Sequence, residues 1–443
     1  MADITTTRIF TDGEKGITAN KLNDIVGSSV IQPAFYSAKP TTSTLGATDQ
    51  MLALLSTGFY AVAPFQTVIN SVSAALNSDQ EIWSVRLRSF NAVGNPNFEV
   101  DQRQCGALFT GTSYGSVLKV IDRWNAQETG TSLDLNTQQV SANVVVPGTS
   151  QLITQKIFRV TLTGQQASLG AGHYMILQSV VEGPTLRELI NDVHSVSLLV
   201  RSSVANLKFG LILQSVNGAY TLSKLCSLGT ANTWTLITLP NLPVWTASGT
   251  WSLTPGVAGY NLIVSLAAGS TYTTVANDTW QASATFGAIG QSNFAGSPVN
   301  STFDIAMVQH EPGPVCSTLM DKPFAGTNGN LEECLRYYQK SYPFATVSAT
   351  AVGSPIYFYN AAGAHPYNAI SFRKIMAKAP TLTAYSPTGG SPGFVRNMTA
   401  PADIAISGPV NPTDNGFGGF SCTAAPPASQ WVSSFHYTAD TGW

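Results

Sequence analysis

The feature that most constrains this fold is a series of short β-branched segments, recurring between turn residues from about residue 96 to residue 315. Branched side chains pack well on a pleated surface, so such segments favour strands. Many of them at regular spacing predict two antiparallel sheets packed face to face. We therefore expect a central jelly-roll β-sandwich over residues 96–315, with a hairpin turn at Asn217-Gly218 and a helical turn over 184–190. The clearest segments are 118–127, 155–164, 173–183, 195–203, 207–225, 233–240, 261–270 and 301–311.

The flanks of this region have a different character, although the chain as a whole is predicted to be mainly β. Residues 344–443 return to short strands rich in Gly, Pro and Ser, and predict a small C-terminal β domain. Residues 1–75 predict a small mixed module, joined to the sandwich by a linker over 76–95. In that module, residues 18–26 predict a short amphipathic helix that cannot bury its own apolar face. The residues expected to dock on a partner are Leu22, Ile25 and Val26.

Composition and charge exclude several functional classes. Charged residues make up 10% of the chain, against about 25% in an average protein, and the formal net charge is −2. No basic stretch suits nucleic acid, no apolar run is long enough to span a membrane, and the N-terminus lacks a signal-peptide core. The five cysteines include no CxxC pair, so we expect buried free thiols and neither a metal nor another cofactor.

The segment LEECLRYYQKSY (331–342) gathers acids, a thiol, an arginine and tyrosines in a chain poor in charge. With Asn330 as N-cap and Glu333 three residues later, it predicts a capped helix over 330–342. Glu332 and Arg336 have the spacing of a helical ion pair. The predicted buried face consists of Leu331, Cys334, Leu335 and Tyr338. We interpret the segment as a linking helix between the two β domains, not as a catalytic site.

Two groups of charged residues invite a catalytic interpretation. Asp101, Arg103, Asp122 and Arg123 lie near Trp124, and the two acids resemble a glycosidase pair. We favour ion pairs across neighbouring strands with Trp124 in the core, because arginine neighbours lower a carboxylate pKa. His310 and Glu311 form the second group.

The side chains of His310 and Glu311 are expected to point to opposite faces of a strand, so they do not converge on a metal. We assign Glu311 a structural role.

Four tryptophans in the later strands and loops leave two interpretations open. Flat aromatic rings beside neutral amides suit a sugar-binding surface, but tryptophan also commonly fills the core of a sandwich. The candidate glycan-binding residues are Trp234, Trp245, Trp251 and Trp280.

The order of several segments resembles a family of tailed-bacteriophage virion proteins that serve as tail fibres, appendages or minor structural proteins. The segments are NPNFEVDQR, IDRW, FDIAMVQHEPGP, LEECLRYYQKSY, SFRKIMAKAPTLTAYSP and FHYTADTGW, in that order. The resemblance covers roughly residues 95–443 and implies a carbohydrate-binding-module-like jelly roll, a linking helix and a C-terminal β domain. The motif residues that it marks as structural include Arg103, Asp122, Arg123, Trp124, Glu311, Arg336 and Tyr338. It supplies no catalytic residues, and His310 stands where a leucine-like residue is expected.

These observations favour a non-enzymatic virion structural protein, made in the host bacterial cytoplasm. Its N-terminus is expected to bind other virion proteins of the tail, neck or capsid. Its β domains are expected to project outward as a homotrimer. These domains are also expected to adhere to host-surface glycan. The trimer is implied by the resemblance alone. The alternatives are a polysaccharide-degrading tailspike-type enzyme, and a head or neck decoration protein without a receptor role.

Overall fold

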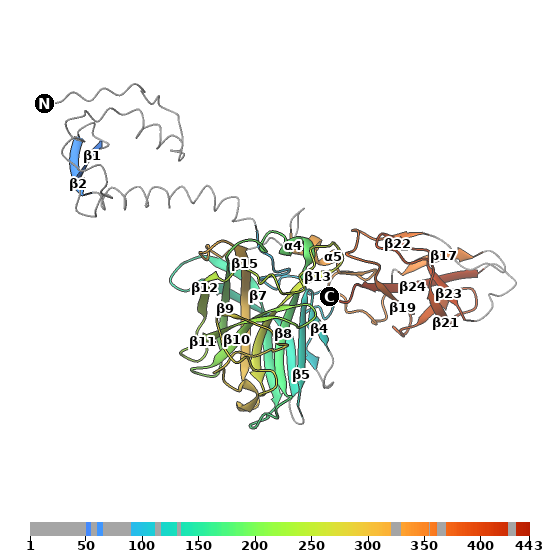
Figure 1. Cartoon of the computed structure of the whole chain (residues 1–443). Coiled ribbons are helices and arrows are strands. Elements are labelled where there is room, and N and C mark those ends of the chain that lie inside the picture. The colour runs from blue at the N-terminus through green and yellow to red at the C-terminus, as the bar shows by residue number, and fades with distance from the viewer. Residues whose placement is uncertain are drawn as a thin grey trace, which may run out of the picture. The chain divides into compact units, whose positions relative to one another are not determined.

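The computed structural model describes most of the chain from residue 90 onward and one hairpin near the N-terminus (Figure 1). The chain forms two compact units, Met1–Leu87 and Arg88–Trp443. No helix of the described residues is long and apolar enough to cross a membrane. The described residues are 50–54, 60–64, 90–110, 117–130, 134–319, 329–353, 355–360, 369–423 and 431–443.

The first unit is described only where β1 (Gln50–Leu54) pairs antiparallel with β2 (Tyr60–Pro64). The predicted docking residues Leu22, Ile25 and Val26 lie outside the described residues, as does most of the predicted linker.

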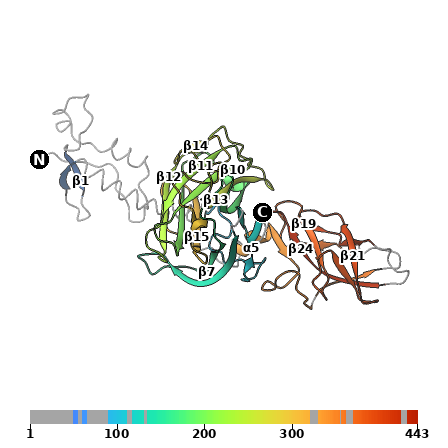
Figure 2. The ribbon, with the colours of Figure 1, turned by 90° about the horizontal axis from the view of Figure 1, so that it is seen from below.

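The second unit contains the predicted β-sandwich, whose two sheets are antiparallel throughout (Figures 1 and 2). The seven-stranded sheet has the order β14 (Trp280–Gln281), β11 (Thr221–Ser227), β10 (Lys208–Ser215), β13 (Ala258–Ala268), β8 (Tyr174–Glu182), β5 (Trp124–Thr129) and β4 (Leu118–Ile121). The six-stranded sheet has the order β12 (Thr235–Leu242), β9 (His194–Ser202), β15 (Thr302–Pro312), β7 (Leu152–Gly164), β6 (Asp134–Val145) and β3 (Phe109–Thr110). All eight predicted segments form strands. Strand β6 lies outside the predicted segments, because most of its residues are polar.

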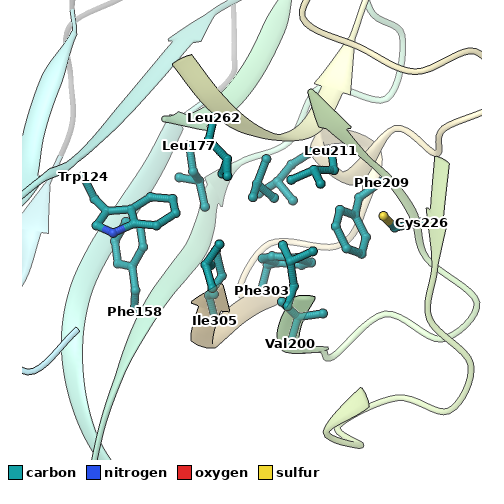
Figure 3. Packing of buried hydrophobic residues seen from close by; sticks show 14 of the residues in the cluster. Trp124, Phe158, Leu177, Val200, Phe209, Leu211, Cys226, Leu262, Phe303 and Ile305 are labelled. Carbon is teal, nitrogen blue, oxygen red and sulfur yellow. The ribbon is translucent and has the colours of Figure 1, made fainter. Parts of the chain in front are cut away.

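Alternate side chains of both sheets meet in one apolar core (Figure 3). Trp124, Phe158, Phe209 and Phe303 are fully buried there, which confirms Trp124 as a core residue. Rings of this size contribute most of the apolar area that a sandwich removes from water. All five cysteines are free, as predicted, but only Cys226, Cys334 and Cys422 are buried, whereas Cys105 and Cys316 are partly exposed.

The C-terminal β domain is built around the long strand β24 (Trp431–Asp440), visible in Figure 2. Its inner face carries a separate apolar cluster that includes Phe358, Phe420, Phe435 and Tyr437. The other strands are β16 (Tyr338–Lys340), β17 (Ile356–Asn360), β18 (Ile370–Ser371), β19 (Thr381–Tyr385), β20 (Phe394–Asn397), β21 (Ala402–Pro409), β22 (Gly416–Phe417) and β23 (Phe420–Cys422).

The helices are short: α4 (Gly183–Leu186), the 3₁₀ turn η1 (Phe294–Gly296) and α5 (Asn330–Leu335). The predicted linking helix over 330–342 is wrong in its second half. After Leu335 the chain turns and becomes β16, which pairs with β24 of the C-terminal domain. A hydrogen-bonded ladder with β24 outweighs the local helical pattern, a common outcome where tertiary pairing competes with propensity.

The polar details of that helix also differ from the prediction. Gly329, not Asn330, is the N-cap, and no side chain caps the helix. Arg336 binds Glu182 of the sandwich, while Glu332 lies 3.4 Å from Lys374, so the expected Glu332–Arg336 pair does not form.

Candidate functional site

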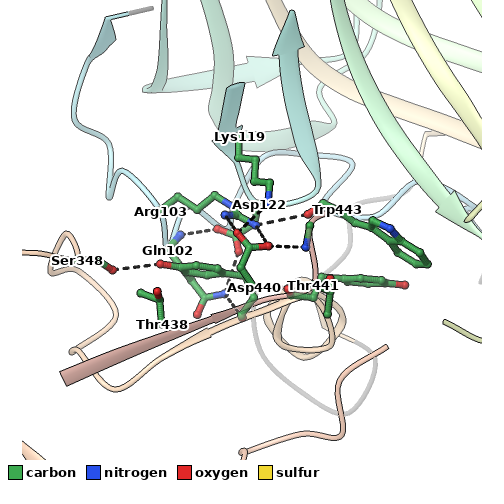
Figure 4. A network of polar contacts seen from close by, with 12 residues as sticks. Gln102, Arg103, Lys119, Asp122, Ser348, Thr438, Asp440, Thr441 and Trp443 are labelled. Atoms are coloured by element: carbon green, nitrogen blue, oxygen red, sulfur yellow. Dashed lines mark hydrogen bonds and ion pairs between the residues drawn. The ribbon is translucent and has the colours of Figure 1, made fainter. Parts of the chain in front are cut away.

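The densest group of charged residues forms a joint between the sandwich and the C-terminal β domain (Figure 4). Arg103 donates from Nη1 to the Asp440 carboxylate at 2.6 Å and from Nη2 at 3.3 Å, and Lys119 lies 3.1 Å from the same carboxylate. The Arg103 guanidinium also covers the Tyr338 ring, 4.2 Å from its centroid. Burial alone raises the pKa of Asp440, but Arg103 and Lys119 outweigh burial and hold this pKa below its ordinary value.

Asp122, in the sandwich, stabilises the joint through hydrogen bonds with Gln102. Its carboxylate accepts hydrogen bonds from the backbone and side-chain amides of Gln102, at 2.6 and 3.0 Å. Gln102 also reaches the Tyr338 carbonyl across the joint. Burial raises the pKa of Asp122 to about 6, against the opposing effect of Arg103. Arg103 lowers this pKa, as expected, but desolvation is the larger effect, so the net shift is upward.

The joint contains a second set of contacts, which centres on Glu182. Glu182, at the end of β8, accepts hydrogen bonds from Arg336 at 2.7 and 2.9 Å and from the Tyr337 hydroxyl at 2.7 Å. The Arg123 guanidinium lies 3.6 Å from the centroid of the Tyr337 ring. Burial raises the pKa of Glu182, but its hydrogen bonds with Arg336, Gly256 and Tyr337 leave this pKa below the ordinary value.

The charged constellation is therefore structural, but its partners are not the predicted ones. Arg103 binds the last strand of the C-terminal domain, not an acid on a neighbouring strand of the sandwich. Asp101 is 2% exposed and Asp122 1% exposed, so the two acids cannot flank a glycosidic bond. Sequence reasoning missed Glu182 and Asp440, which lie 154 and 337 positions from their arginine partners.

The four candidate tryptophans do not form one surface. Trp245, Trp251 and Trp280 pack against one another, with ring centroids 4.8 to 5.3 Å apart. Trp245 is only 5% exposed and belongs to the sandwich core. Trp251 and Trp280 are partly exposed, and their indole N–H groups bind the Thr246 and Val244 carbonyls, which fixes the adjoining loop.

Trp234 lies apart from the other three tryptophans. It packs on a separate apolar cluster of the six-stranded sheet, beneath the Arg201 guanidinium.

His310 belongs to a buried polar chain. Its Nδ1 lies 2.6 Å from the Tyr260 hydroxyl and its Nε2 lies 3.0 Å from Nδ1 of His194, which stacks on Trp245. Glu311 instead accepts hydrogen bonds from Ser317, so His310 and Glu311 do not converge, as predicted. Within the described ranges, no three His, Cys, Asp or Glu side chains are arranged to hold a metal.

Neutral amides occupy the outer face of the seven-stranded sheet. Asn125 on β5 lies directly opposite Gln178 on β8, and Asn261 on β13 is the diagonal neighbour of Gln178. Among the residues that the structure describes, these three side-chain amides have no hydrogen-bond partner, although Asn125 is only 4% exposed. Asn125 is buried, whereas Gln178 and Asn261 are partly exposed, so the amides of these two residues are accessible to water or to a polar ligand.

Aromatic rings lie on the same outer face, toward the other end of β8. Tyr174 contacts Tyr272 and Phe286 with ring centroids 5.0 and 4.9 Å apart, and the latter two rings are partly exposed. Gln178 lies four positions after Tyr174, which is about 13 Å along a strand. We name the surface formed by Asn125, Gln178, Asn261, Tyr174 and Tyr272 the amide–tyrosine face. The sequence carried no signal for it, because strand register decides which amides are neighbours.

Comparison with known proteins gives likenesses in structure only. No protein-family model and no curated protein sequence matches this chain. The carbohydrate-binding module TmCBM61, solved with β-1,4-galactotriose, is 13% identical, with a TM-score of 0.24, over 50% of this chain and 99% of that one. The family 11 carbohydrate-binding module of a Clostridium thermocellum cellulase is 13% identical, with a TM-score of 0.24, over 48% and 98%. The enzymatically active domain of bacteriophage CBA120 tailspike protein 4 is 13% identical, with a TM-score of 0.26, over 51% and 21%.

Replacing Arg103 in the joint is expected to lower the free energy of unfolding substantially. Arg103→Met leaves the partly buried Asp440 carboxylate short of its main partner, so we expect the free energy of unfolding to fall by about 3 kcal/mol. Arg396→Met, which breaks the more exposed pair with Asp403, should cost less than about 1 kcal/mol. Urea denaturation measures both values, and hydrogen exchange in β24 should increase only in the first variant. Equal costs for the two variants would contradict this role of Arg103.

The histidine pair predicts a loss of stability in acid. Burial lowers the pKa of His194 to about 4 and that of His310 well below its ordinary value. At these two histidines the unfolded chain therefore binds more protons than the folded chain below about pH 6.5, so their contribution to stability falls as the pH drops toward 4. For His194 alone the loss approaches about 3 kcal/mol.

Urea denaturation at pH 7 and pH 4.5 measures this loss. Compared with the wild type, a variant with both histidines replaced by glutamine should show at most half of this loss. A pH dependence that survives the double replacement would assign the loss to other groups.

Proposed function

We propose that this chain is a non-enzymatic appendage of a tailed-bacteriophage virion, and that its sandwich binds a neutral host-surface glycan through the amide–tyrosine face. The observation that carries the glycan proposal is the group of adjacent, unpartnered amides on the outer face of the seven-stranded sheet. Each amide offers one acceptor and two donor hydrogens, which matches the paired hydroxyl groups of a sugar. The partly exposed rings of Tyr272 and Phe286 offer flat apolar surface for its C–H groups.

The charge of this face supports a neutral ligand. Lys119 is paired in register with Asn125, but its ammonium is engaged by Asp440. The separation between Tyr174 and Gln178 favours an extended ligand, such as an oligosaccharide, over a single sugar.

The roles of the buried acids support a non-enzymatic appendage. Asp122, Asp440 and Glu182 hold the joint together, and Glu311 is bound by Ser317. A joint held by buried ion pairs suits a protein that must keep two β domains in a fixed arrangement outside the cell. The resemblance to phage virion proteins supports the virion as its location and a homotrimer as its assembly.

Binding measurements on the full chain test the glycan proposal. We expect binding to neutral host polysaccharide on a glycan array, with no release of reducing ends. Gln178→Ala and Asn125→Ala should each weaken binding about tenfold, the equivalent of about 1.4 kcal/mol per lost pair of hydrogen bonds. Gln155→Ala, an exposed glutamine of the six-stranded sheet, is the matched control and should bind normally.

Three other outcomes lead to different conclusions. Loss of binding in Trp280→Ala but not in Gln178→Ala would move the site to the tryptophans. Release of sugar products would favour the tailspike-type enzyme. Absence of binding to any host glycan would favour a head or neck decoration protein.

Deletion of residues 1–75 tests the virion proposal. We expect the shortened chain to be absent from purified particles, because the docking face of Leu22, Ile25 and Val26 is removed. Introduction of a charge into the predicted docking face of the full-length chain (Leu22→Glu) should act in the same direction, whereas Lys21→Glu should not. Immunoblots of particles measure incorporation, and normal incorporation of the deleted chain would overturn this mode of attachment.

A further inference from the structure

Two arginines share one buried carboxylate on the outer face of the six-stranded sheet. Asp304 of β15 is 1% exposed, and its Oδ1 and Oδ2 accept hydrogen bonds from Nε and Nη2 of Arg159 on β7, at 2.8 and 2.9 Å. Its Oδ2 also accepts a hydrogen bond from Nε of Arg201 on β9, at 2.8 Å. The arginines face outward, because the residues before them, Phe158 and Val200, belong to the sandwich core. Two guanidinium groups therefore meet at one carboxylate.

This cluster has one more positive charge than negative. Both guanidinium groups stay charged, because arginine is not deprotonated in proteins, and a single carboxylate balances only one of them. The nearest outward-facing residues along the three strands are uncharged, so they do not balance the second guanidinium. These residues are Ile157, Thr161, Leu199, Thr302 and Met307. An anion placed against the arginines would complete the balance of charge.

The guanidinium groups are fixed in place, but part of each is available for a ligand. Arg201 lies over the Trp234 ring, 4.7 Å from its centroid, and Trp234 packs on an apolar cluster of the same sheet. Among the described residues, Nη1 of Arg159 and both Nη atoms of Arg201 have no hydrogen-bond partner. The two side chains are 30% and 26% exposed. A guanidinium already held by a carboxylate and a ring loses little freedom when it binds an anion.

Neutral polar side chains lie beside these arginines. Thr161 is two positions after Arg159 on β7, which is about 7 Å along the strand. Asn136 of β6 lies directly opposite Thr161 in register. Both side chains are partly exposed, and within the described ranges neither has a hydrogen-bond partner. A hydroxyl and an amide each donate and accept, so they suit the hydroxyl groups of a sugar. The combination favours an anion that also carries hydroxyl groups.

We propose that Arg159 and Arg201, together with Thr161 and Asn136, bind an acidic sugar of the uronate class. The free Nη groups of the arginines bind the carboxylate, because the planar guanidinium matches its two oxygens. Thr161 and Asn136 bind hydroxyl groups of the same sugar, and Asp304 positions the arginines without touching it. This site lies on the sheet opposite the amide–tyrosine face, so it goes beyond the neutral-glycan proposal and does not depend on it.

Calorimetry of the full chain with trigalacturonic acid as the probe tests this proposal. We expect one saturable site whose affinity falls as sodium chloride is raised from about 0.05 M to about 0.5 M, because salt screens exposed charges. The same affinity is expected in Gln178→Ala, which alters only the amide–tyrosine face. Neutral galactotriose should not compete with trigalacturonic acid at the arginines.

Matched variants assign the binding to the arginines. Arg201→Gln leaves Asp304 paired with Arg159, so the variant should fold, and it should bind trigalacturonic acid at least tenfold less tightly. Arg201→Lys keeps the charge but loses the planar group, and should also weaken binding. Arg187→Gln removes an exposed positive charge elsewhere and should bind like the wild type. Thr161→Val provides the test if Arg201→Gln does not fold, and should weaken binding.

Four results would overturn the proposal. The first is a wild type that does not bind trigalacturonic acid, and the second is binding that Arg201→Gln leaves unchanged. The third is loss of binding in Gln178→Ala but not in Arg201→Gln, which would place the acidic sugar on the amide–tyrosine face. The fourth is tighter binding of a glutamate-rich peptide at the same arginines, which would indicate a protein partner. Binding of neutral glycan should be equal in Arg201→Gln and the wild type, so the two proposals fail separately.

Discussion

The arrangement of the two β domains depends on one constraint: the charged side chains at the joint are removed from water and must therefore be paired. The chain has few charged residues, yet Arg103, Asp440, Glu182 and Arg336 are all placed at one boundary between two β domains. A buried ion pair is seldom much more stable than a well-packed apolar contact, but it penalises any arrangement that leaves one partner unpaired. The joint therefore contributes more to the specificity of domain placement than to overall stability.

One of the ion pairs at the joint also affects the neighbouring amide–tyrosine face. Because Lys119 is engaged by Asp440, the outer face beside it presents amides and tyrosines and no free cation among the residues described there. A neutral face of this kind discriminates poorly by charge and must recognise a ligand by the geometry of hydrogen bonds and by apolar contact. That requirement is why the proposed ligand is a glycan and why the register between β5 and β8 matters for its recognition.

In residues 330–342 the local sequence pattern predicts one helix, but the tertiary structure contains a helix followed by a strand. Its apolar spacing predicts a helix, and the first six residues form one. The next residues carry tyrosines, which suit strands as well as helices, and the free edge of β24 offers backbone hydrogen bonds to Tyr338 and Lys340. The arginine that was expected to pair within the helix is then free to bind Glu182. Local periodicity cannot show that a partner strand lies 100 residues further along the chain.

The sequence by itself determined the β class, the two-sheet sandwich, the core position of Trp124 and the free state of the cysteines. Each of these follows from periodicity and residue type, which act over a few neighbouring positions. Only the tertiary structure decided that Arg103 binds Asp440, that Trp245 is a core residue, that Asn125 lies beside Gln178, and that Glu128 is buried without a partner. These depend on strand register and domain contact between distant segments, and a shift of one residue in register would reverse which face each side chain occupies.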